Sequence, residues 1–175
     1  QLFLISPNSL ERALAKYKEV PKFEEIEAGM VEIPLAKIES LGEAIKSFPK
    51  LKIAVNKLVT EGESKKASEA LELILSGALG IEASDIHIEP YEAGTTIRLR
   101  VDGVLHELTK IPLSLYNLLL SRIKLVSEIK LNVRDRPQDG RFTIRTSEDI
   151  EVRTSALPGP YGESLVLRLL LPKTI

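Results

Sequence analysis

Residues 97–108 carry the pattern that most restricts how this chain can fold. Apolar side chains at every second position from Ile97 to Val101 alternate with arginines, and the alternation resumes after Asp102-Gly103. A period of two is typical of a strand that buries one of its faces. Asp-Gly favours a two-residue hairpin turn with positive φ at both positions. The segment therefore predicts an antiparallel hairpin.

The two-residue turn also predicts the register of this hairpin. Three pairs of side chains are expected on its core face: Val101 with Val104, Leu99 with His106, and Ile97 with Leu108. Arg98 is then expected to face Glu107 on the outer surface, where opposite charges stabilise a cross-strand pair.

Further elements are predicted around the hairpin. Helical spacing of apolar residues predicts helices over 67–80 and 113–130, and alternation predicts strands near 85–89 and over 142–145, 150–157 and 164–171. These elements predict an α+β domain over residues 64–172. Its mostly antiparallel sheet is expected to carry helices on one face.

The first 63 residues are expected to precede this domain. A short apolar run and a helix with one narrow apolar stripe, over residues 1–19, are interpreted as a small partial α/β segment, the tail of an earlier domain. Residues 20–63 are punctuated by Pro21, Pro34 and Pro49 and are interpreted as a solvated linker with one helix near residues 35–48.

The composition argues against several classes of function. The absence of cysteine excludes disulfides, thiol nucleophiles and cysteine-based metal centres. A net charge of −1 gives no overall attraction to nucleic acid or to an anionic membrane. No apolar run approaches the roughly 20 residues that span a bilayer. We therefore expect a cytoplasmic protein without nucleic-acid binding or membrane insertion, and both ends of the chain are interpreted as cuts.

The arginines are the most informative charged residues, because nine of the ten occur at Arg98 or later. A register that matches core residues across 150–157 and 164–171 is expected to pair three positions: Val152 with Leu169, Thr154 with Leu167, and Ala156 with Leu165. The same register places Arg153 directly opposite Arg168. Like charges opposed across strands are destabilising, so this pair predicts a shared anion such as a phosphate group.

Other polar clusters give weaker predictions. Asp85, His87 and Glu89 share one strand face, but alternating polar residues are ordinary on a half-exposed strand and His106 is expected on the opposite side, so we expect no metal site. The loop 134–141 has charges of both signs, which predicts a self-paired loop or a protein interface. No phosphate-loop motif or catalytic triad is recognisable, so no catalytic residue is assigned to this chain.

Four motifs, at residues 83–90, 98–103, 136–141 and 162–170, occur in an order that resembles one known family. They resemble the second amino-terminal domain of the type II secretion and type IV pilus assembly ATPases, over about residues 67–171. The resemblance implies a PAS-like fold joined to a RecA-like domain that binds ATP with Mg²⁺, in a hexamer. Arg153 and Arg168 match the two arginines with which this domain reaches the ATP phosphates.

The resemblance therefore implies a regulatory fragment without the RecA-like ATPase domain and without enzymatic activity of its own. Its implied partners are that domain, neighbouring subunits of the hexamer, and platform proteins at the inner membrane, to which the machine would be peripheral. Two alternatives stay open at this point: a stand-alone PAS-like sensor that binds a small ligand in its interior, and an interaction module that docks through the loop 134–141.

Overall fold

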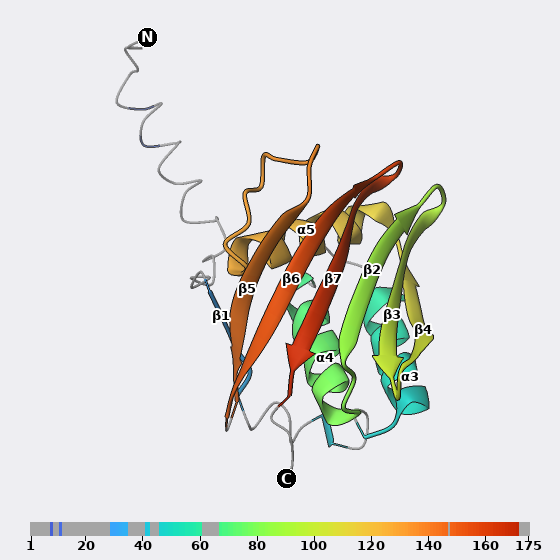
Figure 1. Ribbon diagram of the computed structural model, residues 1–175. Coiled ribbons are helices and arrows are strands. Elements are labelled where there is room, and N and C mark those ends of the chain that lie inside the picture. The colour runs from blue at the N-terminus through green and yellow to red at the C-terminus, as the bar shows by residue number, and fades with distance from the viewer. Residues whose placement is uncertain are drawn as a thin grey trace.

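The structure is a computed structural model that describes residues 8, 11, 29–34, 41–42, 46–60, 67–146 and 148–171 (Figure 1). Its elements are, in chain order, β1 (Met30–Glu32), α3 (Phe48–Thr60), α4 (Ala67–Gly80), β2 (Asp85–Tyr91), β3 (Gly94–Val101), β4 (Val104–Ile111), α5 (Leu113–Val126), β5 (Gln138–Arg145), β6 (Asp149–Gly159) and β7 (Gly162–Leu170). Of the tail expected at 1–19 and the helix expected at 35–48, the structure describes only residues 8, 11, 41–42 and 46–48.

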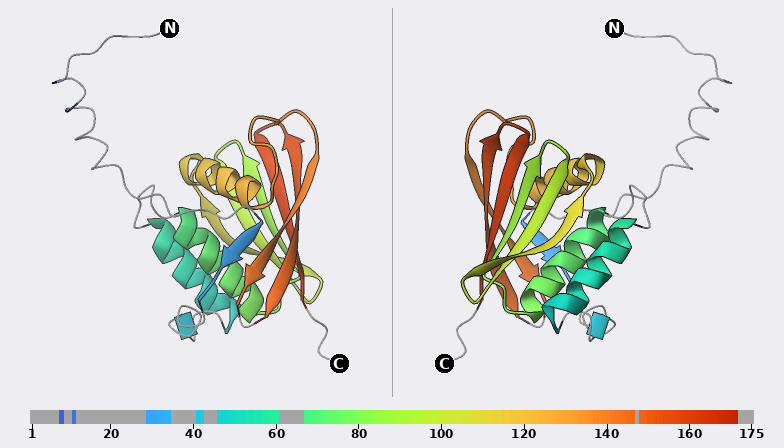
Figure 2. Two further views of the ribbon diagram at one scale, coloured as in Figure 1. Left: turned by 90° about the vertical axis from the view of Figure 1, so that its left-hand side faces the viewer. Right: turned by 90° about the vertical axis from the view of Figure 1, so that its right-hand side faces the viewer.

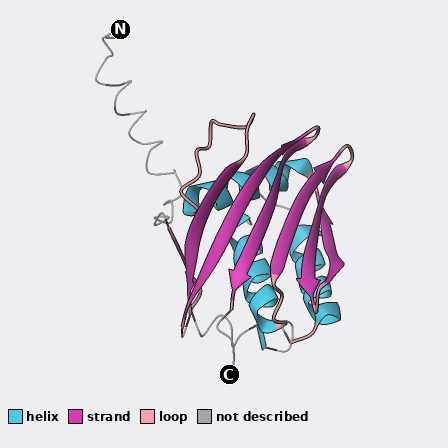
Figure 3. Cartoon of the chain, viewed as in Figure 1, coloured by secondary structure: helices cyan, strands magenta, loops and turns pink. Residues whose placement is uncertain are grey.

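The strands form a single seven-stranded sheet in the order β1-β5-β6-β7-β2-β3-β4. Every neighbouring pair is antiparallel except β1 and β5, which are parallel. Figures 2 and 3 show α3, α4 and α5 together on one face of the sheet, with no described element on the other face. This arrangement confirms the predicted α+β, PAS-like architecture with a mostly antiparallel sheet.

The core lies between the sheet and the helices. Helix α4 buries the apolar positions that its spacing predicted, including Leu71, Ile74 and Leu75. The sheet contributes the core-facing side chains Ile86, Ile88, Ile97, Leu99, Phe142, Ile144, Val152, Leu165 and Leu167. Burying one such side chain contributes about 1.5–3 kcal/mol to stability, so this layer is the main source of the fold's stability.

The β3–β4 hairpin has the predicted turn, with Asp102 at φ 50° and Gly103 at φ 79°. Three predicted pairs are present in the register: Val101 with Val104, Leu99 with His106, and Arg98 with Glu107. The charge of Arg98, however, is paired with Glu89 of β2, at 3.1 Å. The predicted pairing of Ile97 with Leu108 is wrong. The register shifts between Ile97 and Arg98, so Ile97 pairs with Thr109 and Leu108 is the extra residue of a β-bulge.

Two residues of this hairpin that were expected on the core face are exposed. Val104 is 56% exposed, and His106 is also exposed, although its ring lies 5.4 Å from the ring of Phe48 in α3. The reason is that β4 is the edge strand of the sheet. Side chains near its turn lie at the margin of the helical layer, where few groups cover them.

The elements near the end of the chain match the predictions with small shifts at their ends. The three predicted strands are present as β5, β6 and β7, which begin or end within a few residues of the expected positions. The helix expected over 113–130 ends at Val126. It stops there because Glu128 adopts φ 58° and turns the chain away from the helix axis. No described helix is both long and apolar enough to cross a membrane.

Two elements that the sequence analysis did not predict lie within the stretch 20–63. Strand β1 extends the sheet beside β5, and Val31 is buried there. Helix α3 buries Leu51 and Val55 completely against the core. For these residues the structure differs from the expected solvated linker, because their few apolar side chains find a place at the edge of a core built by residues far along the chain.

A glycine permits the close approach of α3 to α4. A Cβ atom at Gly77 of α4 would lie 2.2 Å from Cδ1 of Leu51, which is closer than carbon atoms can approach. Leu51 therefore occupies the space that any larger residue at position 77 would fill. A side-chain hydrogen bond also ties α3 to the sheet, since Thr109 Oγ1 donates to Asn56 Oδ1 at 2.6 Å.

Candidate functional site

The β6–β7 hairpin places Arg153 directly opposite Arg168, as predicted. The three core pairs that suggested this register are also confirmed: Val152 with Leu169, Thr154 with Leu167, and Ala156 with Leu165. The hydroxyl of Thr154 is buried on the helical side, where it accepts a hydrogen bond of 2.8 Å from Ser127 Oγ. The arginines therefore point to the opposite, open face of the sheet.

The two arginines belong to a longer row of side chains across the open face. Successive strand pairings align Arg141 of β5, Arg153 of β6, Arg168 of β7, Asp85 of β2 and Arg100 of β3. Directly paired residues project from the same face of a sheet. We call these five residues the arginine row. It combines four guanidinium groups with one carboxylate.

Asp85 is the buried member of the arginine row, with a side chain only 4% exposed. Its Oδ1 accepts a hydrogen bond of 2.9 Å from Arg168 Nε, and its Oδ2 accepts one of 2.8 Å from Ser84 Oγ. Arg100 Nη1 lies 3.8 Å from Oδ2. Burial alone would raise the pKa of the Asp85 carboxyl, but the hydrogen bonds from Arg168 and Ser84, with the charges of Arg168 and Arg100, hold it below the ordinary 3.8.

Arg153 has a weaker carboxylate partner on its own strand. Its Nε donates to Glu151 Oε1 at 3.3 Å, and both side chains are largely exposed, at 68% and 45%. An exposed ion pair of this kind contributes about 0–1 kcal/mol. Arg153 is therefore held only loosely.

The opposed arginines are thus balanced by separate carboxylates, so their proximity alone does not require a bound anion. Both arginines, however, contact their carboxylates through Nε. No terminal nitrogen of Arg153 or Arg168 makes a hydrogen bond to any described residue. The terminal nitrogens form the end of the guanidinium group that suits a phosphate or carboxylate ligand. The hairpin can therefore offer two guanidinium groups to one anion.

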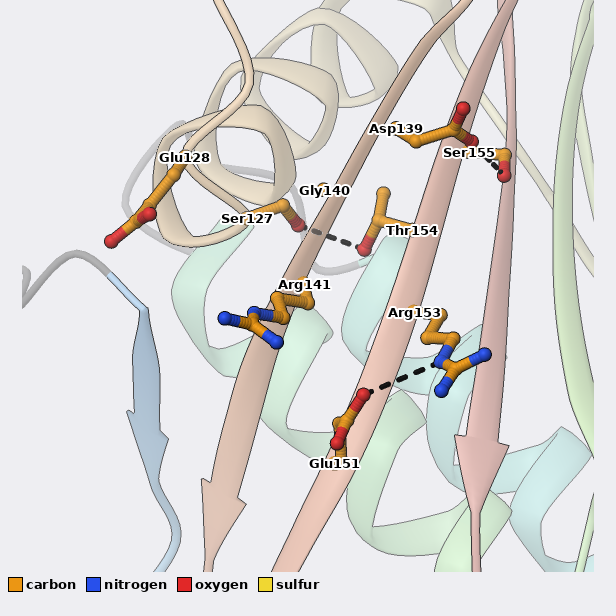
Figure 4. Close-up of a pocket in the computed structure, with 9 residues that line it drawn as sticks. All are labelled: Ser127, Glu128, Asp139, Gly140, Arg141, Glu151, Arg153, Thr154 and Ser155. Carbon is orange, nitrogen blue, oxygen red and sulfur yellow. Dashed lines mark hydrogen bonds and ion pairs between the residues drawn. The ribbon is translucent and has the colours of Figure 1, made fainter.

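A shallow cavity of about 560 Å³ extends from this hairpin towards the turn after α5 (Figure 4). Arg141 and Arg153 both line it, and Figure 4 shows their guanidinium groups turned away from each other. Arg141 makes no ion pair with any residue in the described part of the chain. The strand can approach the turn after α5 only because residue 140 is glycine: a Cβ atom there would lie 2.2 Å from the carbonyl oxygen of Ser127.

The residues that were weighed as metal ligands do not converge on one point in the structure. His87 Nδ1 lies 3.6 Å from Glu89, Asp85 is occupied by Arg168, and His106 contacts Phe48 on the helical side. Within the described ranges, no group of three or more His, Asp or Glu side chains is arranged to hold a metal ion.

The loop 134–141 is not self-paired through its charged residues. Gln138 Nε2 donates to the carbonyl oxygens of Val133 and Lys130, and the Asp139 carboxylate accepts a hydrogen bond from Ser155 Oγ, outside the loop. Arg134 and Arg136 make no ion pair with the residues that the structure describes.

Sequence reasoning predicted Arg153 and Arg168 but missed the other three members of the arginine row: Arg100, Arg141 and the role of Asp85 as a partner of arginines. Asp85 was considered only as a metal ligand, and Arg141 only as part of a charged loop. Their positions depend on β2 lying beside β7 and on β5 lying beside β6. The alternating pattern of β5 could have indicated Arg141, because residues 138–141 continue the alternation that begins at Phe142.

The model of one protein family, described as "Type II/IV secretion system protein", matches residues 60–175. The chain is also similar to "Type IV pilus assembly ATPase PilB" of Myxococcus xanthus, with 35% identity over 118 residues, which are 66% of this chain and 21% of the relative. "Type II secretion system protein E" of Pectobacterium carotovorum is 48% identical over 98 residues, which cover 55% and 20% of the two chains.

Further similarities have comparable extent. "Type II secretion system protein E" of Xanthomonas campestris is 41% identical over 115 residues, which cover 62% of this chain and 20% of the relative. Among solved structures, the chain resembles a crystal structure of the pilus retraction motor PilT with bound ADP, at 25% identity and a TM-score of 0.39, over 58% of this chain and 29% of that one. The chain spans about a fifth of the length of the curated relatives it matches.

Proposed function

Because the chain belongs to the type II/IV secretion system protein family, we propose that it is a regulatory amino-terminal part of a secretion or pilus assembly ATPase. In this proposal a RecA-like domain elsewhere in the parent protein binds and hydrolyses ATP. Arg153 and Arg168 contact the ATP phosphates held by that domain. The parent assembles as a hexamer in the cytoplasm, peripheral to the inner membrane, and engages platform proteins there.

The observation that carries the proposal is the geometry of the β6–β7 hairpin. It aligns Arg153 opposite Arg168 on the open face, and each arginine is held by Nε while its terminal nitrogens remain available. Two guanidinium groups on one rigid hairpin can neutralise the charge that builds up during phosphoryl transfer. Because they lie on this domain and the nucleotide lies on another, their contact also couples nucleotide state to domain position.

The arginines of the site suit the phosphates of ATP, because their terminal nitrogens make no hydrogen bond to a described residue. Mg²⁺ requires oxygen ligands, whereas the carboxylates of Asp85 and Glu151 are already engaged by arginines. In this proposal the ion and the adenosine are therefore held by the RecA-like domain. When bound there, Mg²⁺ would supply positive charge to the phosphates, and this chain would contribute only the cationic contacts of Arg153 and Arg168.

The test uses the parent protein with its RecA-like domain and compares ATPase rates. Arg153→Ala and Arg168→Ala are each expected to lower kcat by at least about tenfold, by analogy with the loss of one preorganised donor in other enzymes. Arg145→Ala is the matched control, since Arg145 is an arginine paired with an exposed carboxylate, Asp149, outside the arginine row. Wild-type rates in both Arg153→Ala and Arg168→Ala would exclude the nucleotide role.

A further inference from the structure

We propose that Asp85 is a positioning residue that orients the guanidinium group of Arg168 towards an incoming phosphate. The inference rests on the proposed function of Arg153 and Arg168 as phosphate contacts. It adds a carboxylate, from a different strand, to a site otherwise composed of cations.

The first step concerns the rigidity of Asp85. Both of its carboxylate oxygens are engaged, Oδ1 by Arg168 Nε and Oδ2 by Ser84 Oγ. The backbone of Ser84 is fixed as well: its N–H donates to Arg100 O at 2.9 Å, and its carbonyl accepts from Leu169 N at 3.0 Å. A side chain that is 4% exposed and held at both oxygens has little freedom to move.

The second step concerns Arg168, whose side chain is 61% exposed. An arginine on an open sheet face would otherwise sample many rotamers, and ordering it costs conformational entropy. The hydrogen bond from Nε to Asp85 fixes the plane of the guanidinium group. Its two terminal nitrogens are then presented together, as a phosphate requires.

The third step concerns Arg100, the member of the arginine row on the other side of Asp85. Its Nη1 lies 3.8 Å from Oδ2, so Asp85 is shared between two cations. Arg168 therefore does not have to neutralise the carboxylate alone and keeps positive charge for an anion. Glu151, by contrast, is exposed and holds Arg153 at 3.3 Å, which makes Arg168 the better ordered arginine of the pair.

Asp85 also has an opposing effect, because its negative charge repels a phosphate. Two like charges at contact distance repel each other in water, and they do so more strongly near a protein surface. If charge alone mattered, removing Asp85 would tighten anion binding. If orientation matters more, removing it weakens binding. The sign of the change therefore decides the question.

The experiment titrates the 175-residue chain with inorganic pyrophosphate and measures Kd by NMR. Asp85→Ala is expected to raise Kd by at least about threefold, since a charge-assisted hydrogen bond that orients Arg168 is lost. Asp139→Ala is the matched control, because it removes another carboxylate from the same face of the sheet. The Asp139 carboxylate accepts a hydrogen bond from Ser155 and makes no described hydrogen bond with an arginine of the arginine row. The variant is expected to leave Kd unchanged or to lower it.

A second readout follows the side-chain Nε–H signal of Arg168. In the wild type this proton should exchange slowly with water, and Asp85→Ala should make the exchange fast. Asp85→Asn keeps an oxygen acceptor with the same shape, so it should show intermediate exchange and a smaller rise in Kd. If Asp85→Ala does not fold, the Kd and the exchange rate of Asp85→Asn decide whether Asp85 positions Arg168. Pyrophosphate binding in the folded variants that equals or exceeds wild-type affinity would overturn the proposal.

The same titration separates this inference from the proposed function. Arg153→Ala and Arg168→Ala should each weaken pyrophosphate binding. If they do not, the arginine pair is not an anion site and the proposed function loses its basis. If they do, and Asp85→Ala fails to weaken binding, only the positioning role of Asp85 is wrong.

Discussion

Lys124 and Glu163 form an ion pair inside the domain, with Lys124 Nζ 2.7 Å from Glu163 Oε1 and side chains that are 1% and 4% exposed. Lys124 Nζ also donates to the carbonyl oxygen of Val133 at 2.8 Å. The pair joins α5 to the first residues of β7, in the hairpin that carries Arg153 and Arg168. It thereby fastens that hairpin to the helical layer.

We predict that Lys124→Met lowers the free energy of unfolding by about 3–5 kcal/mol, because it leaves the Glu163 carboxylate buried without its cation. The double variant Lys124→Met with Glu163→Leu should be more stable than Lys124→Met alone, since no buried charge then remains unpaired. Urea denaturation of the three proteins measures both effects. A double variant less stable than Lys124→Met would contradict this account of the pair.

For Tyr116 we predict that its contribution to the free energy of unfolding is lost in alkali. Its hydroxyl donates to the carbonyl oxygen of Glu163, and burial, together with the negative charge of Glu163, raises the pKa of Tyr116 from 10.0 to about 12. Between these values the unfolded chain releases the tyrosine proton while the folded chain keeps it, so the unfolding free energy contributed by Tyr116 falls as pH rises. The stability difference between wild type and Tyr116→Phe should therefore shrink over this range. Tyr161→Phe, at an exposed tyrosine, is the control: the stability difference between wild type and this variant should not shrink in the same way over this pH range.

For Asp85 we predict the opposite pH dependence: its contribution to the free energy of unfolding is lost in acid. Because the folded state holds the pKa of its carboxyl below the ordinary 3.8, its contribution to stability is fully present above that value and is lost as pH falls through the lower pKa of the folded state. The stability advantage of the wild type over Asp85→Asn should therefore decrease as pH drops below about 4. Denaturation midpoints across this range test it. Asp149→Asn, at an exposed carboxylate, should show a much weaker effect.

The contact between α3 and α4 predicts a coupled pair of substitutions. Gly77→Ala would place a methyl group against Leu51, and such overpacking costs about 1–3 kcal/mol, more than the roughly 1 kcal/mol that alanine contributes to helix propensity. In a Leu51→Ala background the space is open, so the same Gly77→Ala change should become neutral or stabilising. A double-mutant cycle by urea denaturation measures this coupling. Equal effects of Gly77→Ala in both backgrounds would show that α3 does not pack on α4 in this way.

Much of the fold was predictable because its signals are local. The alternation around Asp102-Gly103, the helical spacing of 67–80 and the apolar match between β6 and β7 each depend on residues close in the sequence, and the structure confirms them. The opposition of Arg153 and Arg168 followed from the same local register. The β-bulge at Leu108 did not, because no turn residue or glycine marks it in the sequence.

What the sequence determined by itself was the identity of the strands and helices and the pairing of neighbours along the chain, since period and turn chemistry act over a few residues. Tertiary structure alone decided that β7 lies beside β2, and therefore that Asp85 meets Arg168. It also decided that β1 and α3 join the core. These contacts link residues dozens of positions apart, and they form only when the whole sheet is assembled and its apolar face must be covered.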